Sequence, residues 1–413
     1  MLSLVPNEYW EYSFADMIRG VFTAFWRGDS KHQLHIALPG LGECLTVRSA
    51  RAAIVVALKS LDLPPGASIA APLYCCPVVL RAIESAGCKP RFIDVDRDTC
   101  CLSAKDLAAK NSEVDAVLAV HMFGNLCDMA SLRKAAPGKP IIEDCAQALG
   151  SRLGDRPAGS FGDIAVFSFR SGKYISVGEG GAILCRDKEV EARAAKHLQE
   201  MPPPSCFAEG VHVLKTYLRS LLRREPFWGL VGSRLWNAYS EKVSFESQAL
   251  VVPGQIYETD RTPAVRRIAV LGSRVEKQRS HADYYSRNLT LDPGMLCSET
   301  QGAYFNRLQF PVLVPGGAKQ LVDELKMHQI STSRPYKDIP EIAKHYGYQG
   351  DCPESERIAR SVLVIPCHHA LSIAEVERIT ISVNQAWKDV SAQHRDLELE
   401  SQRNSAIEPQ TTH

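Results

Sequence analysis

The chain has 413 residues, of which 45% are hydrophobic, and its 48 Lys+Arg and 47 Asp+Glu give a formal net charge of +1. This composition is typical of a globular protein with a substantial core, and it excludes global disorder. So balanced a charge argues against nucleic acid as a partner. At this length we expect two or three domains, or one large domain with an appendage.

The thirteen cysteines lack the paired spacing of a zinc site, so we expect no metal. We interpret them as reduced thiols of a cytoplasmic protein. The first twelve residues lack the basic-then-apolar pattern of a signal peptide, and no stretch approaches the ~20 apolar residues of a spanning helix. These features predict a protein that is neither exported nor inserted in a membrane.

Helical and strand-like segments alternate from about residue 45. Ser49–Leu61 has apolar residues at helical spacing and is followed by a Pro-Pro-Gly stop. The same alternation then predicts strands over 68–71, 91–95, 115–120, 140–142 and 163–169, with a helix over 77–86. Strands separated by helices indicate an α/β fold with a mainly parallel sheet that is covered by helices on both faces.

The pattern changes after residue 202, and Val213–Tyr239 is aromatic, basic and amphipathic. A long helix is predicted over 262–289, followed by strands over 309–314 and 362–365 and helices over 321–328 and 373–387. We therefore expect a large domain over 1–260, with an N-terminal extension and a basic helical insertion at about 205–250. A smaller α+β domain is expected over 261–389, and a disordered tail over 390–413.

The residues that could carry chemistry gather between His121 and Gly181. Asp144 directly follows one predicted strand, and Lys173 follows another. In a parallel sheet, ligands bind beyond the carboxyl ends of the strands. A partly desolvated lysine near a buried carboxylate is what Schiff-base chemistry on pyridoxal 5'-phosphate requires, because the lysine supplies the bond and the carboxylate holds a proton on the ring nitrogen. The pair indicates a pyridoxal-phosphate site.

The phosphate of such a cofactor needs N–H and hydroxyl donors. A helix N-terminus offers them best, because its dipole also favours an anion. Ser49, Ala50 and Arg51 open the predicted helix 49–61, and Ser168 follows a strand. These residues are the candidate phosphate donors.

Taken in order, the segments SARAA, APLYCC, FIDVD, VHMFG, IIEDCAQALG, GSFGDIAVFSF, a lysine and GEGG resemble one known family. This is the DegT/DnrJ/EryC1/StrS family of pyridoxal-phosphate sugar aminotransferases, which have the aspartate aminotransferase fold (fold type I). The resemblance is tight over about 47–185 and looser over about 262–387. It implies a large domain with a mainly parallel sheet and a smaller C-terminal α+β domain.

The resemblance also implies roles for individual residues. Lys173 would bind the cofactor covalently and later move the proton between the substrate Cα and C4′. Asp144 would pair with the pyridine nitrogen, and Gln147 would contact the phenolic side of the ring. Ser168 and the backbone of Ala50 and Arg51 would hold the phosphate. Family members that dehydrate carry histidine at the lysine position, so lysine favours amino transfer.

The chain departs from the family pattern at two places in the cofactor region. Cys76 stands where many members have a Trp or Phe stacked on the cofactor, with Tyr74 nearby. The family's Asn-Tyr-Arg stretch, which reaches the neighbouring subunit's phosphate, reads IYETDRTPAV here.

The resemblance implies a cytoplasmic, homodimeric aminotransferase that moves an amino group, from glutamate, to a keto group of a nucleotide-activated sugar for polysaccharide or glycan biosynthesis. The alternatives are another fold-type-I enzyme, such as a non-sugar aminotransferase or a desulfurase, and a non-catalytic cofactor-binding sensor or scaffold. Three interpretations of 213–239 stay open: a lid over the sugar nucleotide, a peripheral contact with anionic membrane lipid, or a helix packed on its own domain or a second subunit.

Overall fold

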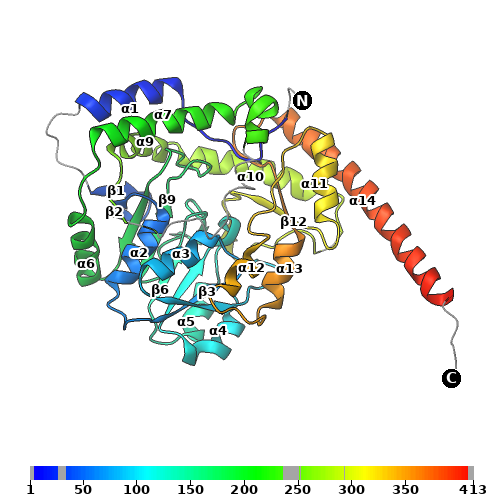
Figure 1. Cartoon of the computed structure of the whole chain (residues 1–413), viewed down its shortest axis with the longest axis horizontal. Coiled ribbons are helices and arrows are strands. Elements are labelled where there is room, and N and C mark those ends of the chain that lie inside the picture. The colour runs from blue at the N-terminus through cyan, green and yellow to red at the C-terminus, as the bar shows by residue number, and fades with distance from the viewer. Residues whose placement is uncertain (1–3, 27–33, 236–250, 252, 293, 408–413) are drawn as a thin grey trace.

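An eight-stranded sheet forms the centre of the fold in this computed structural model, which describes residues 4–26, 34–235, 251, 253–292 and 294–407 (Figure 1). The strand order is β1-β2-β10-β9-β6-β5-β3-β4. Strands β9, β6, β5, β3 and β4 are parallel, whereas β10 is antiparallel to both of its neighbours. The strands are β1 (His35–Leu38), β2 (Gly42–Val47), β3 (Ser68–Pro72), β4 (Lys89–Ile93), β5 (Ala116–Val120), β6 (Ile141–Asp144), β9 (Ile164–Ser168) and β10 (Gly181–Cys185).

Helices cover this sheet, as the alternating pattern predicts. They are α2 (Ala50–Ser60), α3 (Pro77–Ser85), α4 (Ala104–Lys110), α5 (Met129–Ala135) and α6 (Lys188–Gln199), with short turns η1 (Asn111–Glu113) and η2 (Met122–Gly124). The central strands β5, β6 and β9 are buried along their whole length, which explains their continuous apolar sequences. The predicted α/β class with a mainly parallel sheet is confirmed. The sequence pattern did not reveal β1, β2 and β10, the antiparallel part of the sheet.

A second core lies in the C-terminal part of the chain. The antiparallel pair β12 (Phe310–Leu313) and β13 (Val362–Ile365) packs with α10 (Leu271–Asn288), α11 (Ala318–Met327) and α14 (Ile373–Ile407). Val5, from the N-terminal segment, also belongs to this core. Two short helices, α12 (Ile339–Lys344) and α13 (Pro353–Ser361), and the small sheet β11-β7-β8 (Ala303–Tyr304, Arg152–Leu153, Arg156–Pro157) complete the described fold.

Three predicted segments differ from the structure. The single helix expected over 262–289 is two helices, α9 (Glu258–Ile268) and α10. The amphipathic stretch 213–239 starts earlier, as α7 (Cys206–Leu222), and the turn at Glu225-Pro226 separates it from η3 (Trp228–Gly232), since proline cannot continue a helix. Helix α14 continues to Ile407, past residue 390, where we expect the disordered tail to begin, and this stretch contains good helix formers. Residues 236–250 and 408–413 lie outside the described part.

Candidate active site

A cavity of about 1010 Å³ lies where the carboxyl ends of β6 and β9 meet the first turns of α2 and α3. Six residues singled out in the sequence all line this cavity: Ala50, Arg51, Asp144, Gln147, Ser168 and Lys173. They come from three separate segments of the chain, 50–51, 144–147 and 168–173. The parallel sheet brings them together because its strands end at the same edge. We call this side of the cavity the strand-end wall.

Lys173 is held in a tight turn just after β9. Its backbone N–H donates to the carbonyl oxygen of Arg170 (3.1 Å), and the preceding Gly172 has a φ of +88°, a conformation that favours glycine. Burial is the main cause that lowers the pKa of the Lys173 amine to about 8, and the neighbouring Arg170 guanidinium acts in the same direction. The shift leaves a useful fraction of the amine unprotonated, and therefore nucleophilic, near neutral pH.

Asp144 ends β6 and is also buried in this wall. One of its oxygens, Oδ1, accepts a hydrogen bond from the backbone N–H of Ala146 (2.9 Å). Burial raises the pKa of the Asp144 carboxyl above its ordinary range, although this hydrogen bond and the nearby Lys173 oppose the rise. A carboxylate in such surroundings gains most from a cation placed beside it, as a protonated ring nitrogen would be.

The first turn of α2 lies directly against the backbone of β10. Ser49 caps the helix by accepting from the N–H of Ala52 (3.3 Å), and Gly180 donates to the carbonyl oxygen of Arg48 (2.7 Å). A Cβ at Gly181 would come within 2.5 Å of the Phe167 carbonyl oxygen, so this position requires glycine. The glycines of GEGG thus let the positive end of the α2 dipole border the cavity, where an anion is favoured.

Gln147 presents an unsatisfied polar atom in this wall. Its Oε1 is buried without a hydrogen-bond partner, and its Nε2 has only a long contact to the Met122 sulfur (3.7 Å). Buried side-chain amides are normally satisfied. A ligand that places a hydrogen-bond donor at this position would satisfy the Gln147 Oε1.

The two departures from the family pattern have clear structural outcomes. Cys76 lines the cavity, whereas Tyr74 does not, because its hydroxyl donates to the Pro335 carbonyl oxygen (2.9 Å). Trp228 and Tyr336 are the aromatic residues that the described chain contributes to the lining. The stretch IYETDRTPAV forms the start of α9 and its approach, and none of it lines the cavity.

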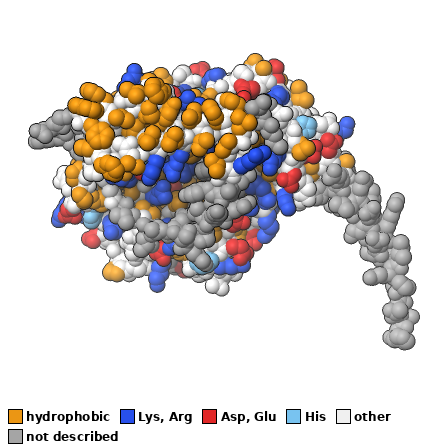
Figure 2. Space-filling model, turned by 45° about the horizontal axis from the view of Figure 1, so that its top comes forward, with side chains coloured by type: hydrophobic (Ala, Val, Ile, Leu, Met, Phe, Trp, Pro, Cys, Tyr) orange, Lys and Arg blue, Asp and Glu red, His pale blue; other side chains and the backbone are white. Residues whose placement is uncertain are grey.

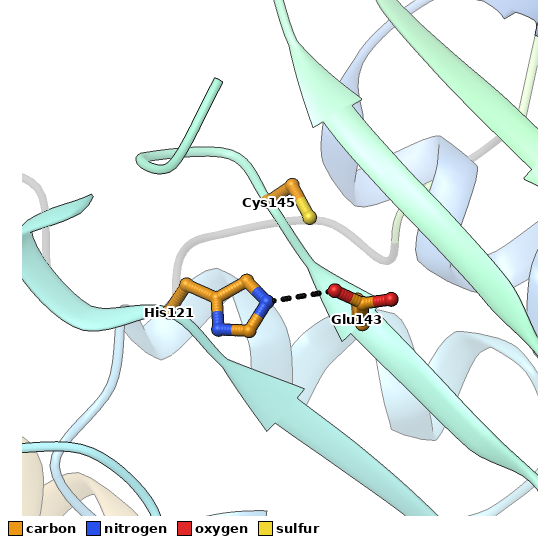
Figure 3. Close-up of side chains that lie close together, drawn as sticks. All are labelled: His121, Glu143 and Cys145. Carbon is orange, nitrogen blue, oxygen red and sulfur yellow. Dashed lines mark hydrogen bonds and ion pairs between the residues drawn. The ribbon is translucent and has the colours of Figure 1, made fainter. Parts of the chain in front are cut away.

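Glu143, next to Asp144, faces away from the cavity and forms a buried cluster with His121 and Cys145 (Figure 3). His121 Nδ1 accepts from the Cys127 N–H (3.1 Å), so its Nε2 carries the proton and donates to Glu143 (3.0 Å). Three backbone N–H groups, of residues 159, 161 and 162, donate to the same carboxylate. The imidazole nitrogens and both carboxylate oxygens have partners, so this cluster is a structural clasp that fixes the end of β6.

The pKa shifts of Glu143 and Cys145 agree with a structural role for the clasp. Burial works against ionisation of Glu143, but the hydrogen bonds from His121 and the backbone N–H groups outweigh it and lower the pKa of this carboxyl. Burial raises the pKa of the Cys145 thiol well above its ordinary value, which keeps it a neutral thiol and a poor metal ligand.

A second part of the cavity lining, which we call the N-terminal wall, comes from segments far apart in the chain. Arg223, at the end of α7, lies between the rings of Trp10 (4.4 Å) and Trp228 (4.7 Å). Glu8 accepts from the Trp10 indole N–H (3.1 Å) and lies 3.6 Å from Arg223. Its charge also acts on Lys173, raising the pKa of that amine. Sequence reasoning missed Glu8 and Trp10, because no local motif marks them.

Several cations line the same cavity. Besides Arg51, these are Arg170, Arg223, Arg234, Lys326, Arg334 and Lys337. Of the basic residues that the sequence offered in 213–239, Arg223 and Arg234 are in the lining, whereas Lys215 and Arg219 are exposed elsewhere on α7. Arg170 could have been noticed from its place between Ser168 and Lys173. The set gives the cavity a strong preference for anionic ligands.

The fold and the buried lysine–carboxylate pair define a protein of the fold-type-I class of pyridoxal-phosphate enzymes. The model of the DegT/DnrJ/EryC1/StrS aminotransferase family matches residues 35–209 and 234–384. The chain therefore belongs to this family, as its motifs indicate.

Individual relatives agree with this assignment. The chain is 34% identical over 151 residues to a GDP-perosamine synthase of Escherichia coli O157:H7, which is 36% of this chain and 42% of that protein. It is 27% identical to a dTDP-4-dehydro-2,3,6-trideoxy-D-glucose 4-aminotransferase of Saccharopolyspora spinosa, over 92% of this chain and 96% of that one. The match with the first of these spans about two fifths of the relative's length.

The structure of S. venezuelae DesV, solved in complex with a ketimine intermediate, has the same fold. Its TM-score is 0.69 at 23% identity, covering 90% of this chain and 94% of that one. At this identity the likeness establishes the fold, which agrees with the sheet order and the second core described above.

Proposed function

We propose that the protein is a pyridoxal-phosphate-dependent aminotransferase that transfers an amino group, from glutamate, to a keto group of a nucleotide-activated sugar. The observation that carries the proposal is the buried pair in the strand-end wall: Lys173, whose pKa is lowered to about 8, and Asp144, whose pKa is raised. Perturbed pairs of this kind gather at functional sites.

The residues of the cavity fit the cofactor. Lys173 offers the amine, Asp144 a carboxylate for the ring nitrogen, and Gln147 an unsatisfied amide oxygen. Ser168 and the first turn of α2, with Ala50 and Arg51, form a lining suited to the phosphate. When bound, pyridoxal 5'-phosphate supplies the electron sink that allows an amino group to leave its carbon.

Each residue then has a defined task. The unprotonated amine of Lys173 would bind the cofactor and, once the substrate amine displaces it, would take the proton from the substrate Cα and deliver it to C4′. Asp144 would hold the proton on the ring nitrogen, because a cation beside it favours the ionised carboxylate. The clasp of Glu143 and His121 holds β6 so that Asp144 does not move.

The cations of the cavity support an anionic acceptor. Arg223 and Arg234 belong to the N-terminal wall, while Arg334 and Lys337 come from the C-terminal part of the chain. Guanidinium groups bind diphosphates by paired hydrogen bonds. Named relatives act on GDP- or dTDP-linked sugars, as their names state. The proposal includes a homodimer in the cytoplasm, because fold-type-I sites are completed across a two-fold interface.

The test mixes the purified holoprotein with glutamate and then with a panel of keto-sugar nucleotides, followed by mass spectrometry. We expect glutamate to convert the yellow cofactor to its amine form and one acceptor to gain an amino group. Lys173→Ala should lose at least ~10²–10⁴-fold in rate, the usual contribution of a positioned acid–base group. Lys188→Ala, an exposed lysine, is the matched control. Amino transfer that survives in Lys173→Ala would overturn the mechanism.

The same experiment separates the alternative functions. Release of sulfur from cysteine instead of conversion by glutamate would favour a desulfurase, for which Cys76 is the thiol in the cavity lining. Conversion by glutamate with no acceptor among the sugar nucleotides would favour a non-sugar aminotransferase. Coloured protein that never turns over would favour a sensor, and protein that stays colourless with added cofactor would favour a scaffold.

A further inference from the structure

Helix α1 (Phe14–Trp26) is amphipathic in the opposite sense to an ordinary surface helix. Its acidic residue, Asp16, is turned inward and pairs with Arg266 (3.0 Å) and Arg267 (3.1 Å) of α9. Its outward side consists of large apolar side chains, with exposed fractions up to 67%: Phe14, Ile18, Phe22, Phe25 and Trp26. A helix that anchors its polar side in the protein and offers aromatic rings to the outside is suited to an apolar partner.

Helix α7 extends this surface. A Cβ at Gly20 would come within 2.8 Å of the Val213 side chain, so the glycine allows α1 and α7 to pack closely side by side. Phe207, Leu214 and Leu218 of α7 are exposed. The apolar band that runs over α1 and α7 is visible in Figure 2.

The region of η3 continues the band toward the cavity. Phe227, Leu230, Val231 and Leu235 are exposed here. Together with the outward side chains of α1 and α7 they form what we call the apolar face. Among the described residues, the apolar face holds most of the large hydrophobic side chains that are exposed. Contiguous patches of this extent mark binding surfaces in soluble proteins.

The exposed charged residues on and beside the apolar face are mostly basic. Arg19, Lys215, Arg219 and Arg234 are exposed on or beside it, whereas among the described residues of 13–26 and 205–235 Glu225 is the one exposed acidic residue. Figure 2 shows Lys and Arg side chains along one edge of the apolar band. Aromatic and aliphatic side chains with a basic rim are the composition of helices that lie in the interface of an anionic bilayer.

The charge of the apolar face also favours an anionic bilayer over a second copy of the chain as its partner. In a two-fold symmetric dimer, a patch meets a copy of itself. Such contact would bring Arg19, Lys215 and Arg219 toward their own copies with few acidic residues to oppose them, and like charges across an interface are unfavourable. An anionic lipid surface offers the complementary charge over the whole face.

We propose that the apolar face docks the protein on the surface of a membrane that contains anionic lipid. The contact is peripheral, since none of the helices in the described ranges has both the length and the apolar character to cross a bilayer. Because Trp228 and Arg234 line the cavity while their neighbours belong to the apolar face, the docked bilayer lies beside the cavity. The aromatic side chains enter the interface and the cations contact lipid phosphates.

The test sediments the full-length holoprotein with vesicles of phosphatidylcholine alone or of phosphatidylcholine and phosphatidylglycerol (3:1), at low and at 0.5 M salt. We expect binding to the phosphatidylglycerol vesicles that weakens with salt. Phe22→Ser/Trp26→Ser should lower the bound fraction at least ~10-fold, since two exposed aromatic anchors are lost. Lys215→Glu/Arg219→Glu should abolish the preference for anionic vesicles. The matched control is Ile373→Ser/Ile381→Ser, which removes exposed apolar side chains of α14 outside the face and should bind like the unaltered protein.

Two results would overturn the proposal. One is the absence of binding to either vesicle. The other is unchanged vesicle binding in Phe22→Ser/Trp26→Ser together with a shift from dimer to monomer in analytical ultracentrifugation, which would assign the face to a second copy. Retained cofactor colour and melting temperature verify that the variant is folded. The readout involves no amino transfer, so it is independent of the proposed function.

Discussion

The two walls of the cavity are built in different ways. The strand-end wall takes Asp144 and Lys173 from the ends of neighbouring parallel strands, where local hydrogen bonds hold the Asp144 carboxylate and the backbone turn at Lys173. The N-terminal wall joins Glu8 and Trp10 to Arg223 and Trp228, which lie more than 200 residues later. Under the proposed function, the first wall carries the chemistry, while the second adjusts its electrostatics.

The strand-end wall should show the largest loss when its carboxylate is neutralised. Asp144→Asn keeps the shape but cannot hold a proton on the ring nitrogen, so we expect kcat for amino transfer to fall ~100-fold or more. Asp155→Asn, in an exposed turn, is the control. Steady-state kinetics on cofactor-loaded protein measures the effect. If kcat of Asp144→Asn stayed within a few fold of that of the unaltered enzyme, the strand-end wall would not be the part of the cavity that carries the chemistry.

The clasp behind this wall should matter for stability. Glu143→Gln removes the negative charge that accepts hydrogen bonds from His121 and three backbone N–H groups. The new side-chain NH₂ is itself a donor, so it cannot accept the bonds that these groups offer. We expect the free energy of unfolding in urea to fall by about 2 kcal/mol, the cost of leaving buried partners unsatisfied. Glu341→Gln, in an exposed pair with Lys344, should change it by less than ~0.5 kcal/mol. Equal free energies of unfolding for the two variants would show that the clasp does not stabilise the fold.

The N-terminal wall should produce the smallest effect, a shift in pH dependence. Free amine reacts with the cofactor, so the rate at which apoprotein takes up pyridoxal 5'-phosphate should rise with pH, with a midpoint near the Lys173 pKa of about 8. Glu8→Gln removes a charge that raises this pKa, so the midpoint should move down. Arg170→Gln, just after the end of β9 and near Lys173, serves as the opposite case: it removes a charge that lowers this pKa, so the midpoint should move up.

The uptake rate is followed by visible absorbance between pH 6 and 10, with a free lysine derivative measured in parallel to correct for titration of the cofactor itself. Midpoints that move in the same direction, or not at all, would contradict the electrostatic role of the two residues.

The strand-end wall was predictable because its parts are local. A strand, the residue after it and the glycines that follow occupy short stretches, so Asp144, Lys173 and the capping Ser49 can be found by spacing alone. The antiparallel strands β1, β2 and β10 were not predicted, because they lie outside the run of alternating strands and helices on which the prediction rests. The N-terminal wall depends on tertiary contacts between distant segments, for which a single sequence holds no local signal. Gln147, by contrast, was identified through the family resemblance.

The central claim is that the Lys173 amine binds the cofactor covalently in the strand-end wall. Borohydride reduction of the holoprotein, followed by digestion and peptide mass spectrometry, tests it most directly. We expect a stable cofactor adduct on the peptide that contains Lys173. An adduct on another lysine, or none on protein that is loaded with the cofactor, would contradict it.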